Sequence, residues 1–163
     1  MAERKIIFLD TTYVMPFFQI QINIKNFDKN TFEKILRKFQ LIILSEISLI
    51  EILFKLTKMY IKKKVPENIF QTFKENLSIL REDRKIKIKP ITSIDIDNYL
   101  YFLKLKYNLN PIDMLILAQG IEADIILTED KNILKISEEK SFKEKYKAKI
   151  LNWSKLTQLY YTS

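Results

Sequence analysis

Apolar residues follow two patterns along the chain. Short runs of consecutive apolar residues alternate with longer segments in which apolar residues recur every three or four positions. The runs are typical of strands buried on both faces, and the longer segments have the period of amphipathic helices. This alternation predicts an α/β fold with a mainly parallel central sheet. The expected strands are Ile6–Leu9, Leu41–Leu44, Ile86–Ile88, Ile125–Leu127 and Lys149–Leu151.

The third expected strand differs from the others. It lies in the sequence KIKIK, which alternates lysine with isoleucine, so it should be half-exposed and lie near an edge of the sheet. No internal repeat, low-complexity linker or sharp change in composition interrupts residues 1–163. The length and continuity predict a single domain.

Three helices have clear start signals in the sequence. The first should run from 46 to about 63, with Ser45 as its N-cap. The second should begin after Thr92, because an aspartate three positions later completes an acidic variant of the capping box. The third should span Pro111–Ile121, with Asn110 as its cap and proline at its first position. Apolar residues cover most of the third helix, which should therefore be largely buried.

The composition excludes several kinds of chemistry. The chain has no histidine and no cysteine, which rules out imidazole or thiolate zinc sites, disulfides, and Ser-His-Asp or Cys-His catalysis. Its single glycine, Gly120, rules out the P-loop and the GxGxxG dinucleotide fingerprint. An enzyme built from this chain would work with carboxylates, hydroxyls, lysine and arginine. Carboxylates without histidine suit Mg²⁺ or Mn²⁺.

The charge balance bears on partners and location. The formal net charge is +8, which favours an anionic partner such as nucleic acid, although solubility alone could also account for it. No run of about 18 apolar residues is free of charge, so no membrane-spanning helix is expected. The first residues lack the apolar region of a signal peptide, and we expect a cytoplasmic protein.

Four carboxylates occupy positions where ligands collect in parallel α/β folds. Asp10 and Asp130 stand at the carboxyl ends of two expected strands, Asp113 lies in the first turn of an apolar helix, and Glu51 lies inside another helix. Each also has a simpler explanation. The first two could cap helices, Asp113 could complement a helix dipole, and Glu51 could pair with Lys55. Gathering all four would favour a bound cation, because like charges raise one another's pKa.

The four carboxylates stand in motifs that resemble those of the PIN-domain family, most closely its VapC-like toxin ribonucleases. The motifs, in order, are Asp10-Thr11, Ser45-x-x-Ser48-x-x-Glu51, Asp113 before an apolar helix, and Thr128-x-Asp130. The resemblance implies a three-layer α/β/α sandwich that binds Mg²⁺ or Mn²⁺ and cleaves RNA endonucleolytically. The implied metal ligands and catalytic residues are Asp10, Glu51, Asp113 and Asp130. The resemblance also implies a homodimer and a small antitoxin partner, as in type II toxin–antitoxin pairs.

Hydroxyl and amide side chains beside these carboxylates would orient them or hold water. They are Thr11, Ser48, Thr128 and Asn132. Asn132 stands where many relatives carry a second aspartate, and an amide adds no charge. This departure leaves two alternatives open. The chain could be a PIN-like module that binds RNA or a protein with weak or no catalysis, or a PIN nuclease of RNA processing or DNA flap cleavage.

Basic and aromatic residues could frame an acidic pocket for RNA. The basic clusters are Lys62, Lys63 and Lys64, then Arg81, Arg84 and Lys85, and the tract Lys140, Lys143, Lys145 and Lys147. Each cluster could equally be a solvated helix face. Three tyrosines could stack on bases, or pack in the core or an interface: Tyr99, Tyr101 and Tyr107.

Overall fold

Five parallel strands form one sheet in the computed structural model, which describes residues 5–161, and their order is β3-β2-β1-β4-β5. Their bounds are β1 Ile6–Leu9, β2 Leu41–Ser45, β3 Ile86–Lys89, β4 Ile125–Leu127 and β5 Lys149–Leu151. All expected strands are confirmed, and β2 and β3 each extend one residue further than predicted. The Lys/Ile strand β3 lies at an edge of the sheet, as its alternation indicated.

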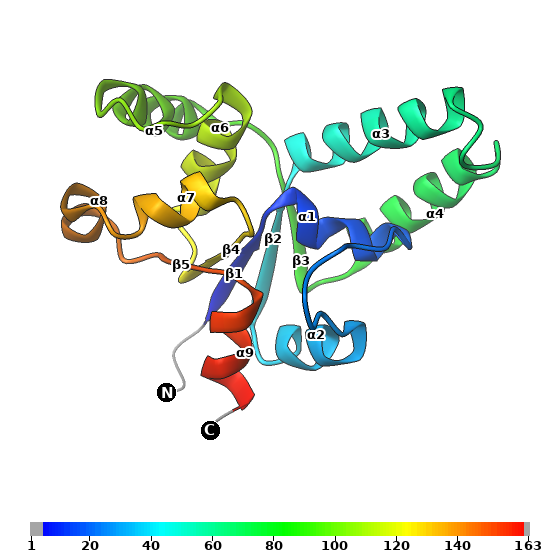
Figure 1. Cartoon of the computed structure of the whole chain (residues 1–163), viewed down its shortest axis with the longest axis horizontal. Helices are drawn as coiled ribbons and strands as arrows, with labels where there is room; N and C mark the ends of the chain where they lie inside the picture. The colour runs from blue at the N-terminus through cyan, green and yellow to red at the C-terminus, as the bar shows by residue number, and fades with distance from the viewer. Residues whose placement is uncertain (1–4, 162–163) are drawn as a thin grey trace.

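Helices cover both faces of this sheet (Figure 1). One layer contains α5 Ser93–Lys104, α6 Pro111–Gly120, α7 Lys131–Ile136 and α8 Lys140–Lys145. The other contains α1 Thr11–Val14, the 3-10 helix η1 Met15–Phe18, α2 Lys29–Leu36, α3 Glu46–Ile61, α4 Ile69–Glu82 and α9 Trp153–Tyr161. The predicted three-layer α/β/α fold is confirmed. Within residues 5–161, no helix has the length and apolar character needed to cross a membrane.

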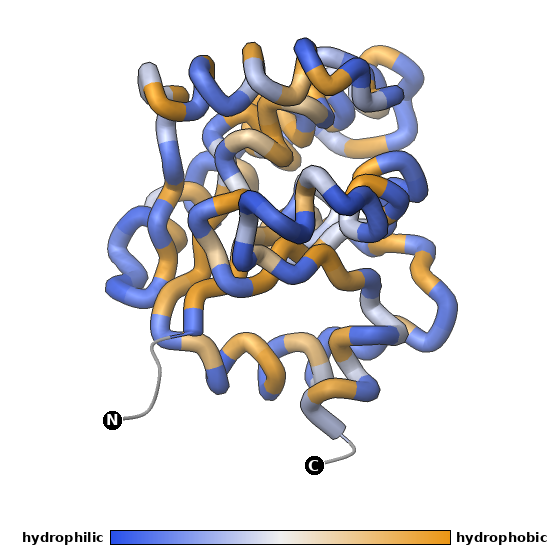
Figure 2. Tube along the Cα trace, turned by 90° about the vertical axis from the view of Figure 1, so that its left-hand side faces the viewer, coloured by the Kyte–Doolittle hydropathy of each residue, from blue (hydrophilic) through white to orange (hydrophobic). Residues whose placement is uncertain are grey.

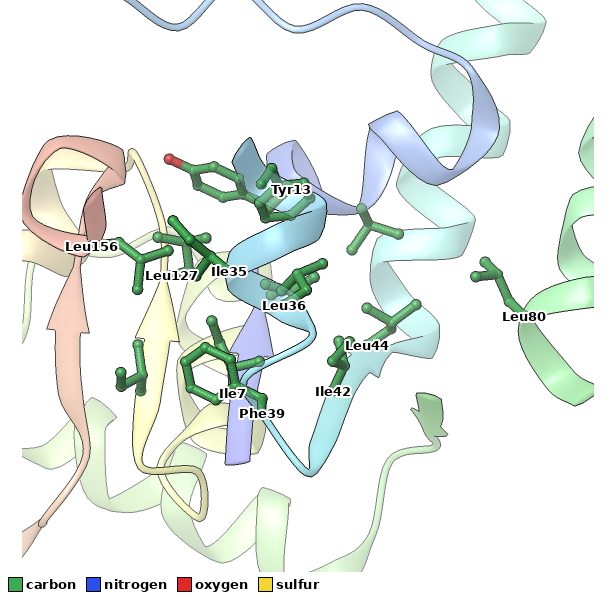
Figure 3. Close-up of a cluster of buried hydrophobic side chains, with 14 of the residues drawn as sticks. Ile7, Tyr13, Ile35, Leu36, Phe39, Ile42, Leu44, Leu80, Leu127 and Leu156 are labelled. Carbon is green, nitrogen blue, oxygen red and sulfur yellow. The ribbon is translucent and has the colours of Figure 1, made fainter. Parts of the chain in front are cut away.

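Successive strand residues point into two separate cores. On β1, Ile7 and Leu9 belong to the core that includes α2 and α9, whereas Phe8 belongs to the core that includes α6 and α7. Figure 3 shows part of the first core, in which Leu36 of α2 packs near Leu44 of β2. The sheet is therefore buried on both faces, which explains why β1 and β4 are apolar at every position and β2 is apolar up to its last residue, Ser45. Figure 2 shows how apolar and polar segments alternate along the chain.

The helix starts match their sequence signals. Ser45 caps α3 by accepting a hydrogen bond from the amide of Ile47, and Thr92 forms a capping box at the start of α5. Asn110 caps α6, whose Pro111 is at the first helical position. These caps fix where α3 and α6 begin, and both helices begin near the carboxyl-terminal edge of the sheet, where the candidate site lies.

A buried polar network joins the edge strand β3 to α5 and α6. The Lys89 ammonium lies 2.9 Å from Asp95 Oδ1, and both side chains are almost completely buried. Burial would raise the pKa of Asp95, but the hydrogen bonds from Lys89 and Thr92 outweigh it and lower that pKa. Ser45 also donates to Gln119 Oε1 at 2.5 Å. The network fixes β2, β3, α5 and α6 relative to one another.

Candidate active site

Asp10 follows β1 directly and has two structural roles. Its Oδ1 accepts a hydrogen bond of 2.7 Å from the Thr11 amide, so it caps α1, as the simpler sequence interpretation expected. Its Oδ2 accepts a bond of 2.6 Å from the Thr128 hydroxyl, which lies at the end of the neighbouring strand β4. The side chain is only 9% exposed. These two bonds hold a nearly buried carboxylate at the carboxyl edge of the sheet.

Glu51 approaches Asp10 from the first half of α3. Thr11 Oγ1 donates to Glu51 Oε2 at 2.5 Å, and the same hydroxyl lies 2.9 Å from Ser48 Oγ. Among residues 5–161, no ion pair joins Glu51 to Lys55, so the structure does not show the alternative in which these two residues pair. The first two motifs of the sequence therefore contact each other through a threonine.

Asp130 caps α7 and is tied to the same network. Its Oδ1 accepts hydrogen bonds of 2.8 Å from the amides of both Asn132 and Ile133. Its own amide donates to Thr128 Oγ1 at 3.0 Å, and Thr128 in turn donates to Asp10. Thr128 is completely buried. One hydroxyl thus fixes the relative position of Asp10 and Asp130, which belong to different strand ends.

Asp113 enters the site from the first turn of α6. Its backbone amide donates to Asn110 Oδ1 at 2.9 Å, and the Asn110 side-chain amide donates to Asp113 Oδ2. Asp113 is half-buried, and apolar residues of α6 surround it in sequence. Asn110 therefore supplies the hydrogen-bonding partner that a carboxylate in this environment requires.

Electrostatic repulsion shows that the four carboxylates share one region. Burial and, after it, the charges of Asp130, Asp10 and Glu51 together raise the pKa of Asp113 to about 6. Burial also raises the pKa of Asp10, hydrogen bonds from Thr128 and Thr11 oppose this, and the charges of Glu51 and Asp130 add to it. Like charges at short range produce this effect, and a cation among them would reverse it.

The oxygen atoms of these carboxylates suit a hard divalent cation. Among residues 5–161, three of the four carboxylates keep one oxygen that accepts no hydrogen bond: Glu51 Oε1, Asp113 Oδ1 and Asp130 Oδ2. Carboxylate oxygens are the ligands that Mg²⁺ and Mn²⁺ prefer. In the same part of the chain, no three acidic side chains are close enough together to hold one ion as they stand. The donor chemistry fits a divalent cation, and binding would require the side chains to draw closer together.

The sequence analysis did not identify two residues whose hydrogen bonds hold parts of the site in place. Asn110 looked like a helix cap only, yet it also orients the Asp113 carboxylate. Glu129, between Thr128 and Asp130, accepts from the Tyr13 hydroxyl and, at 2.8 Å, from the Trp153 amide. The only feature of the sequence that could have indicated this role of Glu129 is its position inside the T-x-D motif. Its contacts attach the end of β4 to α1 and α9.

The basic clusters lie in different parts of the fold. Lys62–Lys64 follows α3, the helix that carries Glu51. The second cluster precedes β3 and therefore lies at the amino-terminal end of the sheet. The length of β3, about 13 Å, separates it from the carboxyl end of that strand. The members of this cluster are Arg81, Arg84 and Lys85. The Lys85 ammonium donates to the carbonyl of Phe39, which lies before β2. The structure therefore does not bring the second cluster to the carboxylates.

The lysine tract makes surface contacts, whereas the candidate tyrosines pack against the core. Lys140 pairs with Glu144 at 3.6 Å, and the Lys145 ammonium lies 3.3 Å from the centre of the Tyr101 ring. The three candidate stacking residues are half-buried and pack against the core beneath α5 and α6: Tyr99, Tyr101 and Tyr107. The structure supports their interpretation as packing residues. Asn132 is exposed and lines a hollow on the α7 side of the site.

The protein is an α/β/α sandwich with an all-parallel sheet. Acidic side chains lie near the carboxyl ends of its central strands, as in α/β proteins that bind ligands at this edge of the sheet. The family comparison makes this class specific. The model of the PIN-domain family matches residues 7–139, and the chain therefore belongs to that family, whose members are generally nucleases. The match includes all four motif carboxylates and ends before α8, β5 and α9.

A comparison with solved structures supports the fold. A chain in the crystal structure of VapBC2 from Rickettsia felis, bound to a DNA fragment from their promoter, superposes with a TM-score of 0.55. The two chains are 18% identical, and the superposition covers 91% of this chain and 98% of that one. At this identity, the similarity establishes the shared fold alone. No protein with a curated description matches the sequence.

Proposed function

We propose that this PIN-domain protein is a Mg²⁺- or Mn²⁺-dependent endoribonuclease and the toxin of a type II toxin–antitoxin pair. The crowding of four carboxylates at one edge of the sheet carries the proposal, because the charges of the other three add to burial in raising the pKa of Asp113. A protein gains nothing structurally from such repulsion, whereas a divalent cation removes it. A bound divalent cation would offset the charge that develops on the phosphate and would make water a better nucleophile.

The residues of the chain have distinct roles in this proposal. Asp10, Glu51, Asp113 and Asp130 supply the oxygen ligands. Thr11 holds Glu51 through its hydroxyl, with Ser48 beside it, and Thr128 holds Asp10 and Asp130 together. Asn132 offers an uncharged amide at the rim of the site. These partners fix the direction of the carboxylates, which determines metal affinity nearly as strongly as the ligands themselves do.

The VapBC2 similarity supports an antitoxin partner, because that structure contains a toxin–antitoxin complex. A second feature supports a homodimer. Helix α5 exposes an apolar stripe at positions i, i+4 and i+7, formed by Ile96, Leu100 and Leu103. A second copy of the chain would bury this stripe. Replacing Leu100 with Glu should convert the dimer into a monomer, measured by light scattering after size exclusion.

The activity is tested by cleavage of single-stranded RNA with and without Mn²⁺. We expect cleavage by the wild-type protein that EDTA abolishes, and no cleavage by Asp10→Asn or Asp113→Asn although both fold. Unchanged cleavage in both variants would show that these carboxylates are not the metal site. Calorimetric titration with Mn²⁺ separates the nuclease from a PIN-like binding module, since a module without a metal site gives no binding heat. Parallel assays with flap DNA test the DNA nuclease alternative.

A further inference from the structure

A row of lysines leads away from the acidic site along one side of α3. The row consists of Lys55, Lys58, Lys62 and Lys64. Together with Glu51 and Phe54, these lysines line a hollow of about 360 Å³. The first three follow Glu51 at positions i+4, i+7 and i+11, spacings that keep them on one side of the helix. At 1.5 Å per residue, Glu51 and Lys62 are about 16 Å apart along the helix axis. The hollow is therefore continuous with the site and extends well beyond it.

These lysines lack the acidic partners that a solvated helix face normally carries. Among residues 5–161, the ion pairs involve Lys89 and Lys140, and none involves a lysine of this row. The Lys55 ammonium contacts the Met15 sulfur at 3.5 Å instead. The helix dipole favours lysines in the last turn, but it does not account for Lys55. A row of unpaired cations that begins at a carboxylate site fits an extended anionic ligand.

The hollow also exposes an aromatic ring. Phe54 is 62% exposed, although a phenylalanine is normally buried, and it lies directly beside Lys55 in the sequence. Single-stranded nucleic acids are bound by this combination, in which cations follow the phosphates and an aromatic ring stacks on a base. An acidic peptide would use the lysines but would not need the ring or the continuity with Glu51.

We propose that single-stranded RNA reaches the carboxylates along α3, with its phosphates on the lysine row and one base stacked on Phe54. This inference rests on the proposed function, because the bound strand is the substrate of the nuclease. The lysine row is Lys55, Lys58, Lys62 and Lys64. It offsets the repulsion that the acidic site exerts on an approaching phosphate chain. Lys63, which has a left-handed backbone with φ of 54°, does not line the hollow.

The test measures binding of a fluorescein-labelled 12-nucleotide oligouridylate in EDTA, so that metal-dependent cleavage does not consume the probe. The double variant Lys55→Ala/Lys58→Ala is compared with Lys34→Ala/Lys155→Ala, which removes two exposed lysines from α2 and α9. Both double variants lower the net charge of +8 by two. A general effect of charge would therefore be the same in both.

We expect the Lys55/Lys58 variant to bind the probe about 10-fold more weakly at 100 mM KCl, and the control to bind as the wild type does. The slope of log affinity against log salt should fall by about 1.4, or about 0.7 for each lost phosphate contact. Phe54→Leu should weaken binding about fivefold or more without changing the slope, because stacking releases no counterions. All positions are exposed, so thermal unfolding should show the variants folded.

Three results of these binding measurements would overturn the inference. If the two double variants bind the oligouridylate equally well, RNA does not follow the lysine row. If Phe54→Leu binds it as tightly as the wild type does, no base stacks on Phe54. A 12-residue oligoglutamate that binds more tightly than the RNA, through Lys55 and Lys58, would make the row a site for an acidic peptide. Failure of the proposed function gives a different result: the probe would bind through the lysine row but stay intact in Mn²⁺.

Discussion

Removing the charge of Asp113 should stabilise the metal-free protein while abolishing its activity. The raised pKa means that folding opposes ionisation of this carboxyl, so the charged form at pH 7 destabilises the native state. A pKa raised from 3.8 to about 6 corresponds to at most about 3 kcal/mol. Because Asp113 is half-buried and water screens its charge, we expect Asp113→Asn to gain about 1–2 kcal/mol. The amide can still accept the hydrogen bond from Asn110.

The pH dependence follows from the direction of the shift. The folded protein holds the Asp113 proton more tightly than the unfolded chain does, so protonation stabilises the fold. That stabilisation is fully present below about pH 3.8 and is lost as the pH rises through about 6. The free energy of unfolding of the wild type should therefore fall relative to that of Asp113→Asn between pH 4 and 7. At pH 4 the two proteins should be nearly equal in stability.

Urea unfolding in EDTA, followed by circular dichroism at pH 4, 5.5 and 7, measures these differences. The matched control is Asp97→Asn, which removes the same charge from an exposed aspartate of α5 and should change stability by less than about 0.5 kcal/mol. If Asp113→Asn were neutral or destabilising at pH 7, or if its gain persisted at pH 4, burial and the neighbouring carboxylates would not oppose ionisation of Asp113 as we infer. Added Mn²⁺ should stabilise the wild type and not the variant.

Three further substitutions test the network and the packing around the site. Thr128→Val keeps the shape of the side chain but removes its hydrogen bond to Asp10. Calorimetry should show an affinity for Mn²⁺ that is at least about 10-fold lower than that of the wild type. Lys89→Met leaves Asp95 buried without its cation, so chemical denaturation at pH 7 should show a loss of about 3 kcal/mol, and adding Asp95→Asn should restore part of it. In Gly120→Ala, the new methyl group would lie 3.0–3.1 Å from buried side chains of β1 and β4, so thermal unfolding should show a net loss of about 1 kcal/mol.

The sequence predicted the strands because burial on both faces leaves an unambiguous pattern. A run such as Ile6–Leu9 fits no surface position, and strand–helix alternation then permits few arrangements other than a parallel sheet. Helix starts were equally clear where a capping side chain marked them, as Ser45 and Asn110 did. These features depend on residues close together in the chain, which is why the sequence alone predicts them.

Contacts between distant segments left no comparable signal. The hydrogen bond between Thr11 and Glu51 joins residues 40 positions apart, and the sequence equally allowed a Glu51–Lys55 pair because that spacing is common on helices. The cluster of Arg81, Arg84 and Lys85 looked as suitable for RNA as any other basic run. Only the parallel pairing of β3 with β2 places it at the amino-terminal end of the sheet, away from the carboxylates.

The sequence left open whether Asp10 and Asp130 are helix caps or metal ligands, and the structure shows that both are helix caps. Each carboxylate accepts backbone amides at the start of a helix, and these bonds hold it at the end of a rigid strand. Without that restraint, repelling carboxylates would turn toward water and separate. The bonds to Asp130 use only one of its oxygens, so the other can bind a cation. The caps therefore hold negative charge at this edge of the sheet, where the proposed metal ion would bind.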